Sequence, residues 1–124
     1  MNRLFVILWM MFFHIVDDYY LQGWLASAKQ KSWWKQNVPD KLYEHDYIWA
    51  LIMHSFSWAF MIMLPIAYVQ QFDIRFNFFI LFVLNIIIHA FVDDLKANKK
   101  LINLWHDQFI HMVQIMFTSV LLYI

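Results

Sequence analysis

Histidine and aspartate residues recur four positions apart in apolar stretches of this sequence. Residues four apart lie on one face of an α-helix, so such a pair can hold a single metal ion. Imidazole and carboxylate together are ligands that zinc, iron and manganese take in proteins. The spacing therefore predicts a divalent transition-metal site, with zinc as the first candidate. The three pairs are His14 with Asp18, His89 with Asp93, and Asp107 with His111.

Each pair belongs to a longer polar stripe on an otherwise apolar segment. Gln22 extends the first stripe, Asn85 and Lys96 extend the second, and Gln114 extends the third. A further apolar segment contributes His54. A charged group near the centre of a bilayer costs at least ~2.5–3.5 kcal/mol, so such residues usually face the interior of a helical bundle. We therefore expect the stripes to face one another.

The segments that carry these residues have the length and composition of membrane-spanning helices. Hydrophobic residues make up 63% of the chain and charged residues 15%, whereas a soluble domain is about 45–50% apolar. One glycine and two prolines leave few turn residues for a β-barrel or sandwich. We expect an all-α, polytopic membrane protein whose single transmembrane domain, residues 1–124, is a four-helix bundle. The spans, each about 20 residues long, are expected at about 3–24, 47–69, 75–94 and 104–124.

Basic residues are distributed unevenly between the connections. Four spans place residues 25–46 and 95–103 on the same side of the membrane, and these loops contain seven of the nine basic residues. The positive-inside rule makes that side cytoplasmic and puts both termini on the outer side. The sequence thus predicts a multi-pass protein with two cytoplasmic loops.

Antiparallel threading of the spans brings the polar residues to a common depth. At 1.5 Å per residue, His54, His89 and His111 lie roughly 10 Å below the cytoplasmic face. Asp18 lies near this level and Asp107 lies nearer the cytoplasm. Both are candidate catalytic bases, because a carboxylate beside the ion can take a proton from an attacking water. The expected metal ligands are His54, His89, Asp93, His111 and His14.

Other ionisable residues have simpler interpretations. Asp17 lies one position off the first stripe, and its role is left undecided. Asp94, among lysines, is expected to fix topology at the membrane interface, and His45 and His106 are expected to be solvated there. A metal-free polar network is the alternative for the whole set, but it would bury several carboxylates with few cations to pair them.

Charge and cysteine content exclude several classes of function. Nine basic and nine acidic residues leave no basic excess for binding nucleic acid. The absence of cysteine excludes a disulfide framework and a thiolate metal site. The expected partners are membrane lipids and a lipid-linked substrate, and assembly into a homo-oligomer is left open.

Four short motifs occur in a fixed order along the chain. They are H-x₃-D-x₃-Q from His14, H-S at His54, H-x₃-D-x₂-K from His89 and D-Q-x₂-H from Asp107. This order resembles a family of small integral membrane proteins of unknown function from bacteria and their phages. The resemblance implies a bacterial cytoplasmic-membrane location and a bacterial or phage-encoded origin. The pattern is also distantly similar to ceramidase-like membrane metal hydrolases, but it lacks their serine and H-x₃-H elements.

These observations favour a membrane-embedded, metal-dependent hydrolase. An ion held by His54, His89, His111 and a carboxylate would lower the pKa of bound water towards ~7. The substrate is expected to be a lipid or lipid-proximal molecule at the cytoplasmic leaflet, because the site lies just below the headgroups. One alternative is an interaction protein, such as a phage exclusion or lysis factor, without a metal or with a structural one. Another is a proton or metal-ion conduit, although the polar stripes stop halfway across the bundle.

Overall fold

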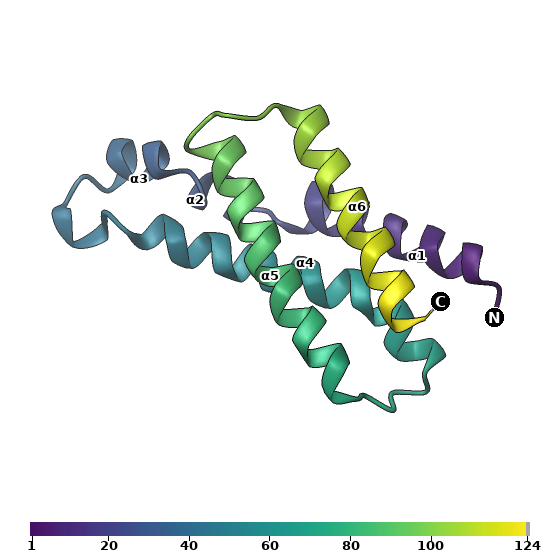
Figure 1. The fold of residues 1–124 in the computed structure, drawn as a ribbon. Coiled ribbons are helices and arrows are strands. Elements are labelled where there is room, and N and C mark those ends of the chain that lie inside the picture. The colour runs from purple at the N-terminus through teal and green to yellow at the C-terminus, as the bar shows by residue number, and fades with distance from the viewer. Residues whose placement is uncertain (124) are drawn as a thin grey trace.

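The computed structural model describes residues 1–123, and over that range the protein consists of helices and their connections, without strands (Figure 1). This agrees with the expected all-α class. The α-helices are α1 (Arg3–Ile15), α2 (Leu25–Ala28), α3 (Lys31–Asn37), α4 (Asp46–Val69), α5 (Phe76–Ala97) and α6 (Leu104–Leu122). A π-helical turn, η1 (Val16–Leu21), follows α1, and a 3₁₀ turn, η2 (Lys41–Tyr43), precedes α4.

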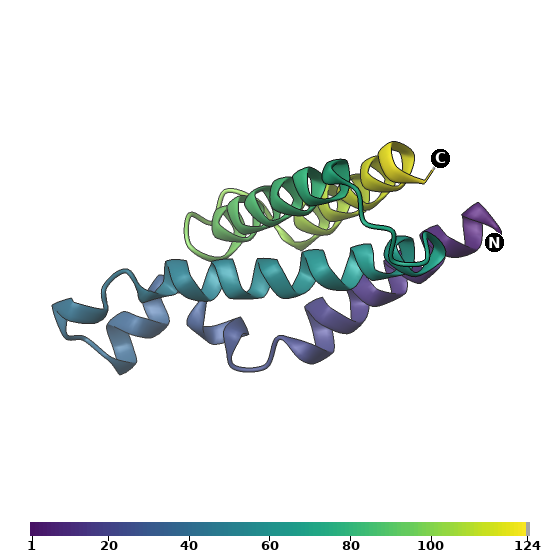
Figure 2. The same ribbon diagram turned by 90° about the horizontal axis from the view of Figure 1, so that it is seen from below.

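The four long helices form two layers (Figure 2). One layer contains α1 and α4, and the other contains α5 and α6 side by side. Both termini lie at one end of the bundle, where the Tyr123 hydroxyl donates a 2.7 Å hydrogen bond to the Met1 carbonyl. We call this the termini end. The opposite end, where α2, α3 and the α5–α6 connection lie, is the loop end.

Three helical segments within residues 1–123 are long and apolar enough to cross a membrane: Arg3–Leu21, Lys41–Val69 and Phe76–Ala97. The fourth expected span, α6, has 19 residues and is not among them. Its first two turns carry His106, Asp107, Gln108 and His111, which lower its average hydropathy. Composition and length therefore support three of the four expected spans.

Burial in this bundle is inverted relative to a soluble protein. Four histidines are fully buried, whereas large apolar side chains are exposed on every long helix. Phe12 on α1, Phe60 on α4, Phe91 on α5 and Phe117 on α6 are all 52–60% exposed. Soluble monomers rarely expose extended apolar surfaces, so this arrangement is consistent with a membrane protein whose outer surface faces lipid.

The interior is divided into an apolar half and a polar half. Val6 and Met10 of α1, Ile62 of α4, Leu81 of α5 and Ile115 of α6 belong to a buried apolar cluster toward the termini end. The buried histidines and aspartates of the same helices lie closer to the loop end. The apolar half thus packs the four helices together, and the polar half contains the buried residues that could bind an ion.

The first helix departs from the single span expected over residues 3–24. Regular α-helix ends at Ile15, and the chain continues through the wider turn η1. The consecutive residues Asp17 and Asp18 are both buried in this turn, although neighbours in a regular helix point about 100° apart. Such π-helical insertions occur frequently at functional sites. Here the turn directs a second carboxylate, Asp17, into the bundle.

Gly23 reverses the chain after η1. Its φ of +53° lies in the left-handed region, where glycine pays no penalty for a Cβ atom. The chain then returns as α2, which packs against α4. The expected loop 25–46 therefore contains α2, α3 and η2, and α2 brings Lys29 back over the polar half of the bundle.

Replacing Gly23 tests this turn. The nearest neighbour of an added Cβ would be the Leu21 carbonyl oxygen at 4.0 Å, so the cost comes from the backbone conformation and not from a clash. We expect Gly23→Ala to lower the free energy of unfolding by roughly 1–2 kcal/mol, and Gly23→Asn to lower it less, because asparagine visits this region more readily. Thermal unfolding in detergent, followed by tryptophan fluorescence, measures both. If the Gly23→Ala protein were as stable as the wild type, residue 23 would not adopt the left-handed conformation that this turn requires.

Candidate metal centre

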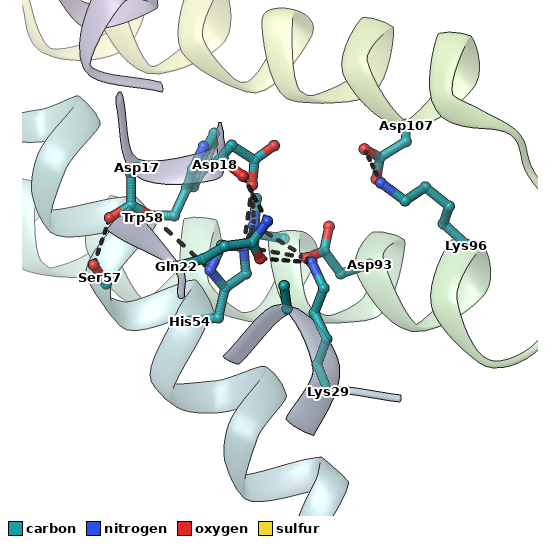
Figure 3. Close-up of polar contacts among 12 residues, drawn as sticks. Asp17, Asp18, Gln22, Lys29, His54, Ser57, Trp58, Asp93, Lys96 and Asp107 are labelled. Carbon is teal, nitrogen blue, oxygen red and sulfur yellow. Dashed lines mark hydrogen bonds and ion pairs between the residues drawn. The ribbon is translucent and has the colours of Figure 1, made fainter. Parts of the chain in front are cut away.

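One carboxylate from η1, one imidazole from α4 and a His–Asp pair from α5 converge in the polar half of the bundle. The four residues are Asp18, His54, His89 and Asp93. Each is buried and offers one ligand atom, and the four atoms all lie within 4.8 Å of one another. Figure 3 shows Asp18, His54 and Asp93 directed toward a common centre. We call these residues the four-residue group.

The spacing of these atoms suits a tetrahedral ion. His54 Nε2 lies 3.1 Å from Asp18 Oδ1, 3.2 Å from His89 Nε2 and 3.3 Å from Asp93 Oδ2. His89 Nε2 lies 3.6 Å from Asp93 Oδ2 and 4.0 Å from Asp18 Oδ1. Ligand atoms 2.0–2.1 Å from a tetrahedral zinc ion are about 3.3–3.4 Å apart. The four-residue group can therefore hold a divalent ion after only small adjustments.

Asp18 also belongs to a second cluster, which we call the three-residue group. Its other members are Asp107 and His111 of α6, and the three ligand atoms again lie within 4.8 Å of one another. His111 Nε2 lies 3.2 Å from Asp107 Oδ1 and 3.2 Å from Asp93 Oδ1. Asp107 and His111 are fully buried. One imidazole thus links the three-residue group to the four-residue group.

His14, which the sequence predicted as a ligand, belongs to neither group. Trp58 Nε1 donates a 2.7 Å hydrogen bond to His14 Nδ1, so this nitrogen is an acceptor. The other ring nitrogen, Nε2, then carries the proton and donates to Gln108 Oε1 at 2.8 Å. Both ring nitrogens are occupied, and no lone pair is left for an ion. We assign His14 a positioning role, because Gln108 in turn donates to Asp18 Oδ2 at 3.1 Å.

Hydrogen bonds behind His111 orient its ring. His111 Nδ1 donates to Gln114 Oε1 at 2.9 Å, while the Gln114 amide nitrogen donates to Asn85 Oδ1 at 3.2 Å. Asn85 completes the chain by donating to Thr118 Oγ1 at 2.8 Å. Partners of this kind fix the tautomer of a ligating histidine. They direct His111 Nε2 toward Asp93 and Asp107.

Asp17, whose role the sequence left undecided, lies behind His54. Its Oδ1 accepts a 2.5 Å hydrogen bond from Ser57, and its Oδ2 lies 4.0 Å from His54 Nδ1 (Figure 3). Neither Oδ2 nor His54 Nδ1 has a hydrogen-bond partner among residues 1–123. A carboxylate behind an imidazole is a common support for a metal-ligating histidine. A small movement of either side chain would join this pair.

Two lysines contact the site. The sequence placed Lys96 on the second polar stripe but indicated only topology for Lys29. Lys29, buried on α2, donates to Asp93 Oδ2 at 3.0 Å and to Gln22 at 3.1 Å. Lys96 pairs with Asp107 Oδ2 at 3.2 Å. The position of Lys29 depends on the reversal at Gly23, which hydrophobic periodicity does not reveal. Its charge offsets part of the cost of burying Asp93.

The ionisable residues expected at the membrane interface lie outside both groups. Asp94 is near Lys99, with 3.9 Å between the charged atoms. His45 is exposed beside Glu44, and His106 is exposed at the start of α6. The structure therefore separates these three residues from the buried cluster.

Comparison with known proteins adds no family assignment: no family model matches the chain, and no curated protein or solved structure is significantly similar to it.

The Lys29–Asp93 ion pair can be tested without any metal. Removing one partner of a buried pair leaves an uncompensated charge, at a cost of about 3–5 kcal/mol. We expect Lys29→Met to lose stability on this scale when unfolding is measured in detergent with a chelator. Lys35→Met, which changes an exposed lysine on α3, should stay within about 0.5 kcal/mol of the wild type.

A double-variant cycle sharpens that measurement. If the pair forms, adding Asp93→Asn to Lys29→Met should recover part of the lost stability, because the buried charge is then gone. Strictly additive losses in the double variant would show that Lys29 and Asp93 do not interact.

Proposed function

We propose that this protein is a membrane-embedded, metal-dependent hydrolase that acts on a lipid or lipid-proximal substrate. The observation that carries the proposal is the four-residue group, in which buried Asp18, His89 and Asp93 atoms lie 3.1–3.3 Å from His54 Nε2, the spacing of ligands around a tetrahedral ion. Zinc is the ion we favour, because it binds imidazole nitrogen and carboxylate oxygen and prefers tetrahedral coordination.

Each chemical task can be assigned to residues of this chain. Asp18, His54, His89 and Asp93 would hold the ion, whose positive charge would stabilise the charge that develops on the bond being cleaved. Asp107 and His111 form the reactive side of the site. Asp107 Oδ1 is buried and accepts no hydrogen bond from any residue in the described range 1–123. It therefore has a lone pair available for the attacking water or for a further ligand.

A groove beside the site supports a substrate that comes from the membrane. The groove has a volume of about 580 Å³ and lies between η1 and the start of α6. Gln108 is part of its lining and also bonds Asp18 and Asp107. An apolar chain in the groove would therefore place its polar end next to the reactive side. The lining residues are Ile15, Tyr19, Tyr20, Leu104, Trp105, Gln108 and Met112.

We further propose that α6 is the fourth span and that the loop end is cytoplasmic. Beyond His106 the exposed residues of α6 are apolar, Phe109 and Phe117 among them, while Asp107, His111 and Gln114 are buried. A helix of this kind can cross a membrane despite its composition, because its polar groups are covered by the bundle. The loop end also carries seven of the nine basic residues, which favours the cytoplasmic side.

Reporter fusions test this topology. A reporter at Lys35, in α3, should be cytoplasmic, whereas a reporter fused after the C-terminus should be on the outer side, because four spans return the chain there. Finding both reporters on the same side would refute the four-span arrangement.

A metal-free interaction protein is the second candidate, and the two ion pairs favour it. Lys29 and Lys96 each neutralise a buried aspartate, so the cluster can hold the bundle together without an ion. A conduit has less support. The buried residues toward the termini end, including Met10, Ile62 and Ile115, form an apolar cluster that offers no path to an ion.

Metal analysis of the detergent-purified protein separates the two main candidates. We expect the wild type to retain a divalent transition metal and His89→Ala to lose the ion of the four-residue group. His45→Ala, which changes an exposed histidine, should retain the wild-type content. Wild-type protein that takes up no metal after incubation with Zn²⁺ would leave only the metal-free function.

Hydrolysis is then tested with the same proteins in vesicles of bacterial inner-membrane lipids. Mass spectrometry should detect new cleavage products with the wild type and with His45→Ala. His89→Ala and Asp107→Asn should form at least tenfold less product, since general acid–base groups typically contribute 10²–10⁴-fold. Equal product formation by Asp107→Asn and the wild type would show that Asp107 takes no part in the reaction.

A further inference from the structure

The three-residue group differs from the four-residue group in the number of ligands. Four protein ligands fill every corner of a tetrahedral ion, whereas catalytic zinc sites keep three protein ligands and one position for water or substrate. Asp18, Asp107 and His111 supply three. The three-residue group therefore has the number of protein ligands that a catalytic zinc site has.

The two oxygens of Asp18 face different neighbours. Oδ1 lies 3.1 Å from His54 Nε2, inside the four-residue group. Oδ2 accepts a hydrogen bond from Gln108 Nε2, and the same nitrogen lies 3.0 Å from Asp107 Oδ2. Asp18 is thus placed between the groups, as a carboxylate that bridges two ions must be. Its position in η1 makes it accessible to both α4 and α6.

The contacts of His111 also favour an ion. Because Nδ1 is bonded to Gln114, Nε2 is the nitrogen that faces Asp93 Oδ1 and Asp107 Oδ1, each at 3.2 Å. With Nδ1 as the donor, Nε2 of the neutral ring has a lone pair and no proton, and Asp107 Oδ1 remains without a hydrogen bond from any of residues 1–123. A divalent ion between His111 and Asp107 would satisfy both atoms. Lys96 does not compete, because it pairs with the other oxygen, Oδ2.

We propose that Asp107, His111 and the bridging Asp18 hold a second divalent ion, so that the site is dinuclear. This inference rests on the proposed function, since the first ion occupies the four-residue group. It assigns Asp107 as a ligand on the reactive side. Pairs of ions a few ångströms apart stabilise both the attacking and the leaving atom in hydrolytic enzymes, which suits this position beside the groove.

The number of bound ions tests the proposal. The purified protein is stripped with a chelator, reloaded with Zn²⁺, freed of excess metal and analysed by mass spectrometry. We expect two equivalents in the wild type and one in both Asp107→Asn and His111→Ala. His106→Ala, which changes the exposed neighbour of Asp107, should keep two.

The deciding reading of a second measurement comes from the wild type and does not depend on a variant that folds. Wild-type protein loaded with Mn²⁺ should give an exchange-coupled electron paramagnetic resonance signal, because Asp18 would bridge the two ions. Asp107→Asn should give the signal of isolated Mn²⁺.

Wild-type saturation at one equivalent, with an uncoupled signal, would overturn the second ion and leave the proposed function standing. Saturation at zero would overturn both.

Discussion

Buried aspartates in an apolar bundle must be compensated, and the rest of this structure follows from that constraint. Asp93 is the clearest case, because its two oxygens contact Lys29, His54, His89 and His111. Removing a carboxylate from water costs several kcal/mol, and the cost is recovered only when good partners surround it. Each long helix accordingly contributes imidazole, amide or carboxylate groups to one layer, and the chain reverses at Gly23 to add a lysine.

The same constraint explains the division of the bundle into two halves. Toward the termini end, Met10, Ile62 and Ile115 belong to a buried apolar cluster, which forms an apolar base. Toward the loop end, Trp58 connects this base to the site by stacking on His89, with ring centroids 4.2 Å apart, and by donating to His14. A site built on rigid helices holds its ligands more precisely than one built on loops. Asp18 and Lys29 are the exceptions, because they lie on the short segments η1 and α2.

Periodicity and antiparallel threading were sufficient to predict much of this arrangement. The four-residue spacing of His89 and Asp93 fixes a common helix face, and equal depth from the loop end places His54 and Asp18 beside them. The expectation for His14 shows what spacing cannot provide, because it identifies a face but not the partner that already occupies each ring nitrogen. Trp58 and Gln108 occupy both nitrogens here. The burial of Asp17 depends on a π-helical turn, and that of Lys29 on one left-handed residue; neither has a signal in hydrophobic periodicity.

The most direct test of the central claim is X-ray absorption spectroscopy at the zinc edge of the loaded protein in detergent. The bound zinc should have nitrogen and oxygen neighbours at about 2.0–2.1 Å, together with the outer scattering of imidazole rings that His54 and His89 would contribute. In His89→Ala the imidazole contribution should fall. A wild-type spectrum with oxygen neighbours alone, and no imidazole scattering, would contradict the claim that the buried histidines and aspartates form a metal centre.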